Sequence, residues 1–409
     1  MSWLVAVVGL LLLVLIHEAG HFFVALAVGM RPRKFYVGFP PPLVRKVHNG
    51  IEYGIGAIPL GGYVRIPGMH RPASKDVRLN FGPAIEAAPE LLEPVKSMER
   101  LLDAQDRTGA RAQYDTLRVA VDDAGLTGMP RRSAERGLRD LEESLSSEAY
   151  WRQPTWKRVA VILAGPGVNI VFAVAIFTVA FAVGAPGGAP STEVGAIESN
   201  RPAGRVGLDV GDRIVAVNGK PTKSFDAIRT AISSSHGAPT ALTVDRDGRT
   251  VRLPPVRTVK VGGRWIMGFI PAAELKSFPV GTSFRLALDE CWNAVRGTGE
   301  AIAALFHKQQ RGQLTSTVGI VKESHTALQL GFRTYLPLLA YISLALALLN
   351  LLPLLPLDGG HILFSLIERV RRRAVAREVY ERASVIGFAL IMLVFLIALN
   401  NDIGGRGPG

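Results

Sequence analysis

The sequence of 409 residues contains a single cysteine, Cys291. One thiol cannot form an intrachain disulfide, and it excludes zinc sites that are built from several cysteines. Lysine and arginine are absent from the first 30 positions, although they outnumber aspartate and glutamate by 47 to 34 in the whole chain, for a formal net charge of +13. The location of this positive charge therefore decides whether it serves nucleic acid, a membrane surface or membrane topology.

Long apolar runs are the most prominent feature of the chain, in which 48% of the residues are hydrophobic. A helix of about 20 residues crosses a hydrocarbon layer of about 30 Å, and four runs reach that length. They occupy residues 3–29, 159–184, 335–357 and 383–400. The sequence therefore predicts an α-helical polytopic membrane protein with about four transmembrane helices.

The first apolar run has an alternative interpretation as a cleaved signal peptide. Ala25-Leu26-Ala27 matches the small-residue pattern of a cleavage site. A signal peptide begins with a basic segment, however, and its apolar core is not interrupted by polar side chains such as His17 and Glu18. We therefore expect residues 1–30 to form a membrane span.

Basic residues cluster at the ends of the apolar runs and predict the topology. The clusters are Arg31, Arg33 and Lys34, then Lys157 and Arg158, then Arg369, Arg371, Arg372 and Arg373. The positive-inside rule places these segments in the cytoplasm, so both termini and the segment between the second and third spans face outward. The expected location is the plasma (inner) membrane, the expected contacts are membrane lipids, and nucleic acid is not an expected partner.

The composition changes along the chain and predicts a series of segments. They are the first span at 1–30, a membrane-associated β-hairpin region at 31–70, a cytoplasmic helical insertion at 71–150, the second span at 151–185, a small mixed α/β domain at 186–273, an interfacial amphipathic helix and linker at 274–334, the third span at 335–361, a basic cytoplasmic loop at 362–382, and the fourth span with a tail at 383–409.

The segment His17-Glu18-Ala19-Gly20-His21 carries the strongest chemical signal. On a helix, positions i and i+4 share a face, so both imidazoles can reach one Zn²⁺ while the glutamate lies beside the site as a general base. Two histidines and a carboxylate inside an apolar span are costly unless a polar partner engages them. The sequence therefore predicts a zinc site within the first span.

A hydrolytic zinc site needs a third protein ligand, and the end of the third apolar run offers one. Asp358 follows a run that carries no charge from Tyr335 onward, next to prolines and glycines that permit an irregular backbone. The alternative for Asp358 is a helix N-cap or an interfacial residue. His361 competes with it as the third ligand and could instead orient the Asp358 carboxylate. We predict Asp358 as the ligand.

The two motifs together resemble the site-2 protease family of intramembrane metalloproteases. The residues that carry the resemblance are His17-Glu-Ala-Gly-His21 and Asn350…Pro353…Asp358-Gly359, joined by Pro59-Leu-Gly-Gly-Tyr-Val and Ala164-Gly-Pro-Gly-Val-Asn169. The chain is most similar to the bacterial RseP-like group, in the form with one PDZ domain that is typical of actinobacteria. Residues 186–273 look like that PDZ domain, and the insertion at 71–150 departs from the family pattern.

The resemblance implies roles for individual residues and a class of substrates. It implies zinc on His17, His21 and Asp358, with Glu18 as the catalytic base. It also implies that Asn350 binds substrate backbone, and that a hairpin at Gly61-Gly62 docks an unwound substrate as an added strand. The implied substrates are transmembrane proteins, such as anti-sigma factors or signal-peptide remnants, and the PDZ domain is expected to be extracytoplasmic.

Two other classes of function remain as alternatives. Histidines and carboxylates within membrane spans also mark ion pathways, which would make the chain a metal transporter or sensor. The second alternative is a scaffold without enzymatic activity that holds membrane partners through the PDZ domain. The protease spacing of Glu18 argues against the first, and the intact set of predicted site residues argues against the second.

Overall fold

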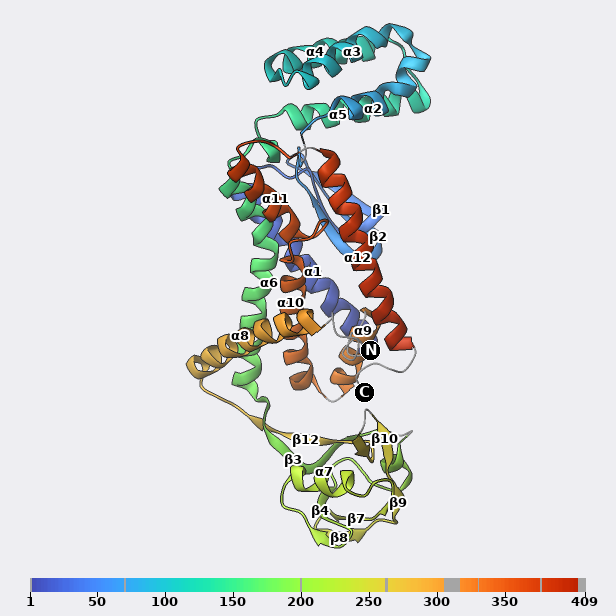
Figure 1. Ribbon diagram of the computed structural model, residues 1–409, viewed down its shortest axis with the longest axis vertical. Helices are drawn as coiled ribbons and strands as arrows, with labels where there is room; N and C mark the ends of the chain where they lie inside the picture. Colours follow the sequence, from blue (N-terminus) through green and yellow to red (C-terminus); the bar gives the residue numbers. More distant parts are fainter. Residues whose placement is uncertain are drawn as a thin grey trace. The chain divides into compact units, whose positions relative to one another are not determined.

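The computed structural model describes residues 2–69, 71–198, 201–261, 264–304, 317–329, 331–375 and 377–403. The chain divides into two compact units, each of which is described by itself. One unit consists mainly of Phe172–Ile342, and the other mainly of Val7–Val171 with Ser343–Gly407. Figure 1 labels the helices and strands in chain order.

Among the described residues, four helices are long and apolar enough to cross a membrane. They are α1 (Ser2–Ala27), α6 (Thr155–Val183), α10 (Phe332–Asn350) and α12 (Arg377–Ile403). At 1.5 Å per residue, even the 19 residues of α10 extend about 28 Å, close to the thickness of the hydrocarbon layer. The prediction of a helical membrane protein is confirmed at this level.

The third apolar run differs from the prediction in where its helix ends. We expected a span over 335–361 followed by a basic loop over 362–382, but α10 ends at Asn350 and a further helix, α11, covers Asp358–Arg371. Pro353 and Pro356 interrupt the helix because proline cannot donate the backbone hydrogen bond that a helix interior requires. Beyond them the chain resumes a helix, so most of the predicted basic loop is helical.

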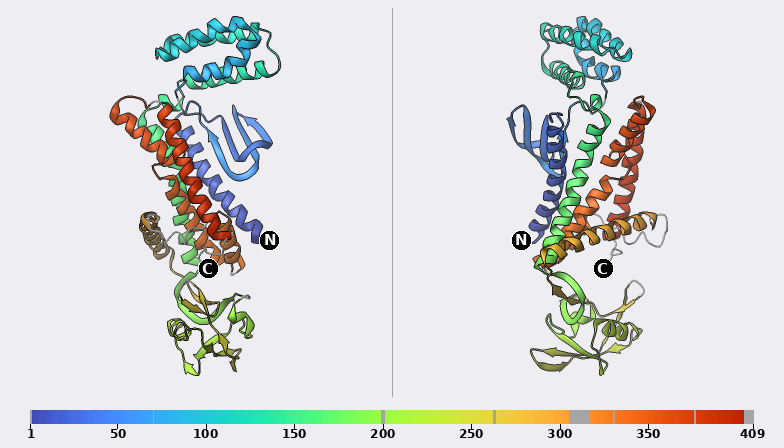
Figure 2. Two further views of the ribbon diagram at one scale, coloured as in Figure 1. Left: turned by 45° about the vertical axis from the view of Figure 1, so that its right-hand side comes forward. Right: turned by 90° about the vertical axis from the view of Figure 1, so that its left-hand side faces the viewer.

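The β-hairpin region consists of two long paired strands, β1 (Lys34–His48) and β2 (Ile51–Arg65), joined by an Asn49-Gly50 turn with positive φ at both residues. Strand β2 bends, so that two of its segments flank the start of β1. Residues 34–37 of β1 pair with 52–55 on one side and with 62–65 on the other. The sheet packs on α1, where the Phe22 ring contacts the rings of Phe35 and Tyr53. Figure 2 shows the sheet beside α1 in both views.

The two glycines of the predicted docking hairpin lie in its second strand. Gly61 and Gly62 lie within β2, and Gly62 pairs with Val37. Among the described residues, no strand pairs with the other side of 62–65. This segment is therefore a free sheet edge.

The insertion at 71–150 is helical, as the sequence predicts. Its helices are α2 (Ser74–Ala87), α3 (Leu92–Asp103), α4 (Arg107–Asp123) and α5 (Gly128–Leu145). They surround a hydrophobic core of their own that includes the fully buried Phe81, Met98 and Leu117. Two short 3₁₀ turns complete this part, at Pro89–Leu91 and Tyr150–Arg152.

The segment after α6 folds as a small mixed α/β domain. The main sheet has the order β12-β3-β4-β7-β8 and is covered by helix α7. Its elements are β3 (Ala185–Ile197), β4 (Arg213–Val217), β5 (Lys220–Pro221), α7 (Phe225–Ser233), β7 (Leu242–Arg246), β8 (Arg249–Arg252) and β12 (Phe269–Lys276), with short strands β6 (Pro239–Thr240), β9 (Val256–Arg257), β10 (Val259–Val261) and β11 (Arg264–Ile266) and a 3₁₀ turn at Pro202–Arg205. The predicted turns at Asn218-Gly219 and Asp247-Gly248 are present, each with positive φ.

Two further helices precede α10. Helix α8 (Val280–Ala304) has a polar and small-residue face, with Ser283 and Ala287 fully buried, while Phe284 and Trp292 remain exposed. This pattern suits the predicted interfacial helix. Helix α9 covers Thr317–Gln329. The predicted linker includes 305–316, which lie outside the described residues.

Candidate metal centre

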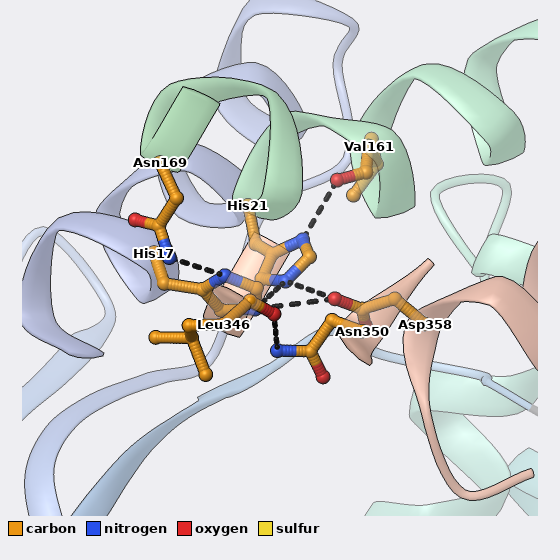
Figure 3. A network of polar contacts seen from close by, with 7 residues as sticks. All are labelled: His17, His21, Val161, Asn169, Leu346, Asn350 and Asp358. Carbon is orange, nitrogen blue, oxygen red and sulfur yellow. Dashed lines mark hydrogen bonds and ion pairs between the residues drawn. The ribbon is translucent and has the colours of Figure 1, made fainter. Parts of the chain in front are cut away.

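Helix α1 presents the two histidines of the first motif on one face. His17 and His21 are separated by one helical turn, and their Nε2 atoms lie 3.2 Å apart. Both side chains are buried, with exposed fractions of 6% and 7%. Two imidazole nitrogens therefore meet inside an apolar helix pair rather than in solvent (Figure 3).

A backbone contact fixes the orientation and the tautomer of His21. Its Nδ1 atom lies 2.8 Å from the carbonyl oxygen of Val161 in α6. A carbonyl oxygen can only accept, so Nδ1 carries the proton and donates it. The lone pair of the neutral ring is then on Nε2, which faces His17 and Asp358 and is the atom that a metal would need.

Asn169 in α6 plays the corresponding part beside His17. Its Nδ2 atom lies 3.4 Å from His17 Nδ1, and its Oδ1 atom is buried without a hydrogen-bond partner among the described residues. The two ends of an amide have nearly the same shape, so the group can be rotated to present Oδ1 to His17 Nδ1–H. That orientation gives the buried oxygen a donor and leaves the lone pair of His17 on Nε2.

Asp358 approaches the histidines from the first turn of α11. Its Oδ2 atom lies 3.1 Å from His17 Nε2 and 3.3 Å from His21 Nε2. The preceding segment 351–357 folds back against the start of α11, where a Cβ on Gly359 would lie 2.2 Å from the carbonyl oxygen of Leu351. The Asp-Gly sequence is therefore required sterically, because only glycine lets the loop return closely enough to place Asp358.

The three ligand atoms fit a zinc ion. Among the described residues, His17, His21 and Asp358 form one group whose ligating atoms all lie within 4.8 Å of one another. With metal–ligand bonds of about 2.0–2.1 Å, a tetrahedral site separates its ligand atoms by about 3.3 Å. The observed separations of 3.1, 3.2 and 3.3 Å match that value. Two nitrogens and one carboxylate oxygen also match a hydrolytic zinc site, which keeps its fourth position open.

A close approach of α1 and α6 makes room for these rings. A Cβ on Gly165 would lie 2.3 Å from His21 Nε2 and 2.9 Å from His17 Cε1. On the facing helix, a Cβ on Gly20 would lie 2.6 Å from the carbonyl oxygen of Ala164. Glycine at these two positions is therefore what allows α6 to pack over the imidazoles.

The predicted base and the free sheet edge meet the ligands at one cavity. This cavity has a volume of about 550 Å³, and its lining includes the three ligands, Glu18, Asn350, His361 and residues 63–66 of β2 and the chain that follows it. A Cβ on Gly62 would lie 3.1 Å from Glu18 Cγ, and Val64 lines the cavity together with Glu18. The sheet edge therefore runs directly past Glu18.

Of the other residues discussed as site candidates, Asn350 and His361 line the cavity and Gly61 does not. Asn350 is the last residue of α10; its Nδ2 donates to Leu346 O at 3.0 Å, and its side chain lines the cavity (Figure 3). His361 lines the cavity but is not part of the ligand group. Gly61 does not line it, and a Cβ there would lie 2.8 Å from the Phe39 ring.

Comparison with known protein families identifies the chain. The family described as "Peptidase family M50" matches residues 5–394. The chain belongs to peptidase family M50, the site-2 protease family. The relatives of this M50 peptidase cover nearly all of it.

Three of these relatives show the level of sequence identity. A protein of Rhizobium meliloti named "Putative zinc metalloprotease" is 30% identical, over 96% of this chain and 94% of its own. A protein of Brucella suis with the same description is 29% identical, over 96% and 93%. The "Probable protease eep" of Enterococcus faecalis is 25% identical, over 96% of each chain.

The family and these relatives confirm the predicted family, the predicted enzyme class and the predicted zinc cofactor. The M50 peptidase is a membrane zinc metalloprotease, and zinc is its cofactor. The roles of single residues stay predictions, although the structure brings the three predicted ligands and the predicted base to one cavity.

Sequence reasoning gave no role to two residues of this M50 peptidase's centre, Asn169 and Gly165, although both lie in a segment that carries the family resemblance. Both signals were present in the second apolar run. Asn169 is a polar side chain within an otherwise apolar segment, and such residues face a partner inside the protein. Gly165 belongs to Gly165-Pro166-Gly167, where small residues mark a close helix contact.

Proposed function

We propose that this chain is an intramembrane zinc endopeptidase that cleaves transmembrane segments of other membrane proteins. The observation that carries the proposal is the convergence of His17 and Asp358, 341 positions apart, with Glu18 on one cavity beside a free sheet edge. The first motif lies within an apolar helix, so the centre is built for a substrate that reaches it inside the membrane.

The proposed roles follow from the geometry. His17, His21 and Asp358 hold the zinc, while Asn169 and the Val161 carbonyl orient the two imidazoles. When bound, zinc supplies a Lewis acid that polarises the scissile carbonyl and lowers the pKa of a water molecule. Glu18 accepts the proton of the attacking water and delivers it to the leaving amide nitrogen, as a general base and then a general acid.

The free edge of β2 is the proposed site for the substrate backbone. A transmembrane helix hides its peptide bonds in its own hydrogen bonds, so it must unwind before it is cut. An extended segment added along 62–65 would regain those bonds and pass beside Glu18. Gly62 brings no side chain to the part of this edge nearest Glu18, and Gly61 precedes it in the same strand. Asn350, on the cavity wall, offers an amide that can donate to a substrate carbonyl.

The proposed topology places the insertion at 71–150 in the cytoplasm and the domain at 186–273 outside, in the plasma (inner) membrane. The support is the basic residues that flank the spans. We propose that the outer domain is a PDZ domain that restricts which substrates enter. Anti-sigma factors or signal-peptide remnants, already shortened outside the membrane, are the proposed substrates. Reporter fusions after Ala110 and Gly195 test the two orientations directly.

The decisive test of the mechanism is Glu18→Gln. The amide keeps the size of the side chain but cannot accept the proton, so cleavage of a membrane-spanning substrate should fall about 100- to 10,000-fold. Zinc content, measured by mass spectrometry of the purified protein, should stay at the wild-type level. Glu93→Gln, an exposed change on α3, is the control and should cleave normally. Normal cleavage by the Glu18 variant would refute the proposed role.

A further inference from the structure

We propose that the insertion carries a binding site for a phosphate group, formed by Arg107, Arg111 and Arg152 in a cavity beside Trp151, with Arg71 stacked on the same indole ring. The ligand class is a phosphate-bearing anion, and an anionic phospholipid headgroup is the source that the position of the site favours. This site lies outside the metal centre and does not depend on the proposed protease mechanism.

Two arginines converge on one indole ring. The guanidinium carbon of Arg71 lies 5.1 Å from the ring centroid of Trp151, and that of Arg107 lies 4.9 Å from it. Trp151 is held in place by its Nε1–H, which donates to the Ser144 carbonyl at 2.9 Å. Stacking on the ring offsets only part of the repulsion between two like charges, so an anion placed there would stabilise both.

The next two arginines line one cavity with Arg107. The cavity has a volume of about 460 Å³ and is lined by Arg107, Thr108, Arg111, Ala112, Asp115, Leu145, Trp151 and Arg152. Arg111 follows Arg107 by one turn of α4, so both project from the same face. Arg152 is anchored by Nη1, which donates to the Leu145 and Ser146 carbonyls at 3.0 Å each. Its remaining N–H groups stay available to a ligand.

The four arginines lack carboxylate partners. Within the described ranges, none of them forms an ion pair within 4.0 Å, and Asp115 lines the cavity without pairing with them. Elsewhere in the insertion, Arg78 and Arg131 are each bound to a carboxylate, at 2.8 Å. Burial lowers the pKa of Arg71, and the charge of Arg107 lowers it further, although Glu368 opposes this. A phosphate would supply the missing negative charge and accept several N–H donors at once.

The position of the cavity favours a lipid headgroup. Trp151 and Arg152 lie just before Thr155, where the apolar helix α6 begins, and Trp156 is exposed on that first turn. Tryptophan and basic residues at the end of a span lie at the level of lipid headgroups. Basic pockets at this depth bind anionic headgroups, whereas neutral phosphatidylcholine offers no net negative charge.

The test uses the full chain in lipid nanodiscs. Wild type is compared with Arg107→Gln/Arg111→Gln, with the charge-preserving Arg107→Lys/Arg111→Lys, and with the control Arg118→Gln/Arg132→Gln. The control removes the same charge from exposed arginines of α4 and α5 that do not line this cavity. In one arm, native mass spectrometry measures retained phosphatidylglycerol; in the other, calorimetry in pure phosphatidylcholine nanodiscs measures binding of inorganic phosphate.

We expect the glutamine pair to retain phosphatidylglycerol at least about tenfold more weakly than wild type, with the lysine pair in between and the control unchanged. Binding of inorganic phosphate that depends on Arg107 and Arg111, without lipid retention, would support the site and assign it to a soluble phosphate compound. Equal behaviour of the glutamine pair, the control and wild type in both arms would overturn the proposal. Circular dichroism of each variant separates loss of binding from loss of fold.

Discussion

Asn169 is completely buried in α6, and its amide nitrogen lies 3.4 Å from Nδ1 of His17 on α1. The partner that orients this ring thus comes from a different apolar helix. Replacing Asn169 with leucine should leave His17 free to rotate and to take the wrong tautomer, and zinc affinity should fall about 10- to 100-fold. Competition with a chromogenic chelator measures the affinity. Asn169→Asp keeps an oxygen acceptor and should bind zinc more tightly than the leucine variant; equal affinity in the two would contradict this role.

Asp358 and His361 can be separated as ligands by substitution. Asp358 Oδ2 lies within 3.3 Å of both histidine nitrogens, whereas His361 only lines the cavity. Asp358→Ala should therefore remove zinc and abolish cleavage. His361→Ala should keep the metal, with a loss of activity of roughly 10- to 100-fold at most. Zinc analysis of the purified variants decides the question, and the reverse pattern would show that His361 is the ligand.

Gly165 and Gly167 provide a matched pair for the packing of α6 over the centre. A Cβ on Gly165 would lie 2.3 Å from His21 Nε2, while a Cβ on Gly167 would meet no atom within 4 Å. Gly165→Ala should displace the imidazoles and strip the zinc, whereas Gly167→Ala should retain both zinc and activity. The two changes add the same methyl group two residues apart in one helix, so helix propensity cannot explain a difference. Retention of zinc by Gly165→Ala would show that the helices separate easily.

Arg65 connects the free sheet edge to the insertion. Its Nη2 atom lies 3.0 Å from both Asp140 and Glu143 of α5, and it lines the cavity of the metal centre. Arg65→Ala should loosen the edge segment and raise KM for a membrane-spanning substrate by up to about fivefold, with zinc content unchanged, because half-exposed ion pairs contribute up to about 1 kcal/mol.

The control for this change is Arg131→Ala, which breaks ion pairs within the insertion at Asp122 and Glu135. It should leave KM unaltered. Asp140→Asn combined with Glu143→Gln should reproduce the effect of Arg65→Ala. If the carboxylate variants cleave like wild type, the insertion does not act on the edge through Arg65.

The sequence alone was sufficient for the features that depend on local order. Apolar runs of about 20 residues predict membrane helices wherever they stand, and the spacing of His17 and His21 places both imidazoles on one helical face. The same holds for Asn218-Gly219 and Asp247-Gly248, since these dipeptides favour turns through their own backbone preferences.

Tertiary structure decided the features that depend on which segments meet. The basic segment 362–382 was expected as a loop and is largely helical, at the end of α11 and the start of α12, because a run of charges marks topology without specifying backbone conformation. Gly61 and Gly62 were expected in a hairpin that docks substrate, and the pairing of 62–65 with 34–37 decided which strand of the sheet is the outer one.

The centre itself shows the same division. Its helical half was predicted from five consecutive residues, and Asp358 from its place at the end of the third apolar run. Asn169 and Gly165 received no role, because their distance along the chain from His17 and His21 says nothing about their distance in space. The packing of α6 and α11 on α1 brings the Asp358 carboxylate, the Asn169 amide and the side-chain-free Gly165 to the two imidazoles. Such packing depends on side-chain shape across the whole helix contact, so no short motif predicts it.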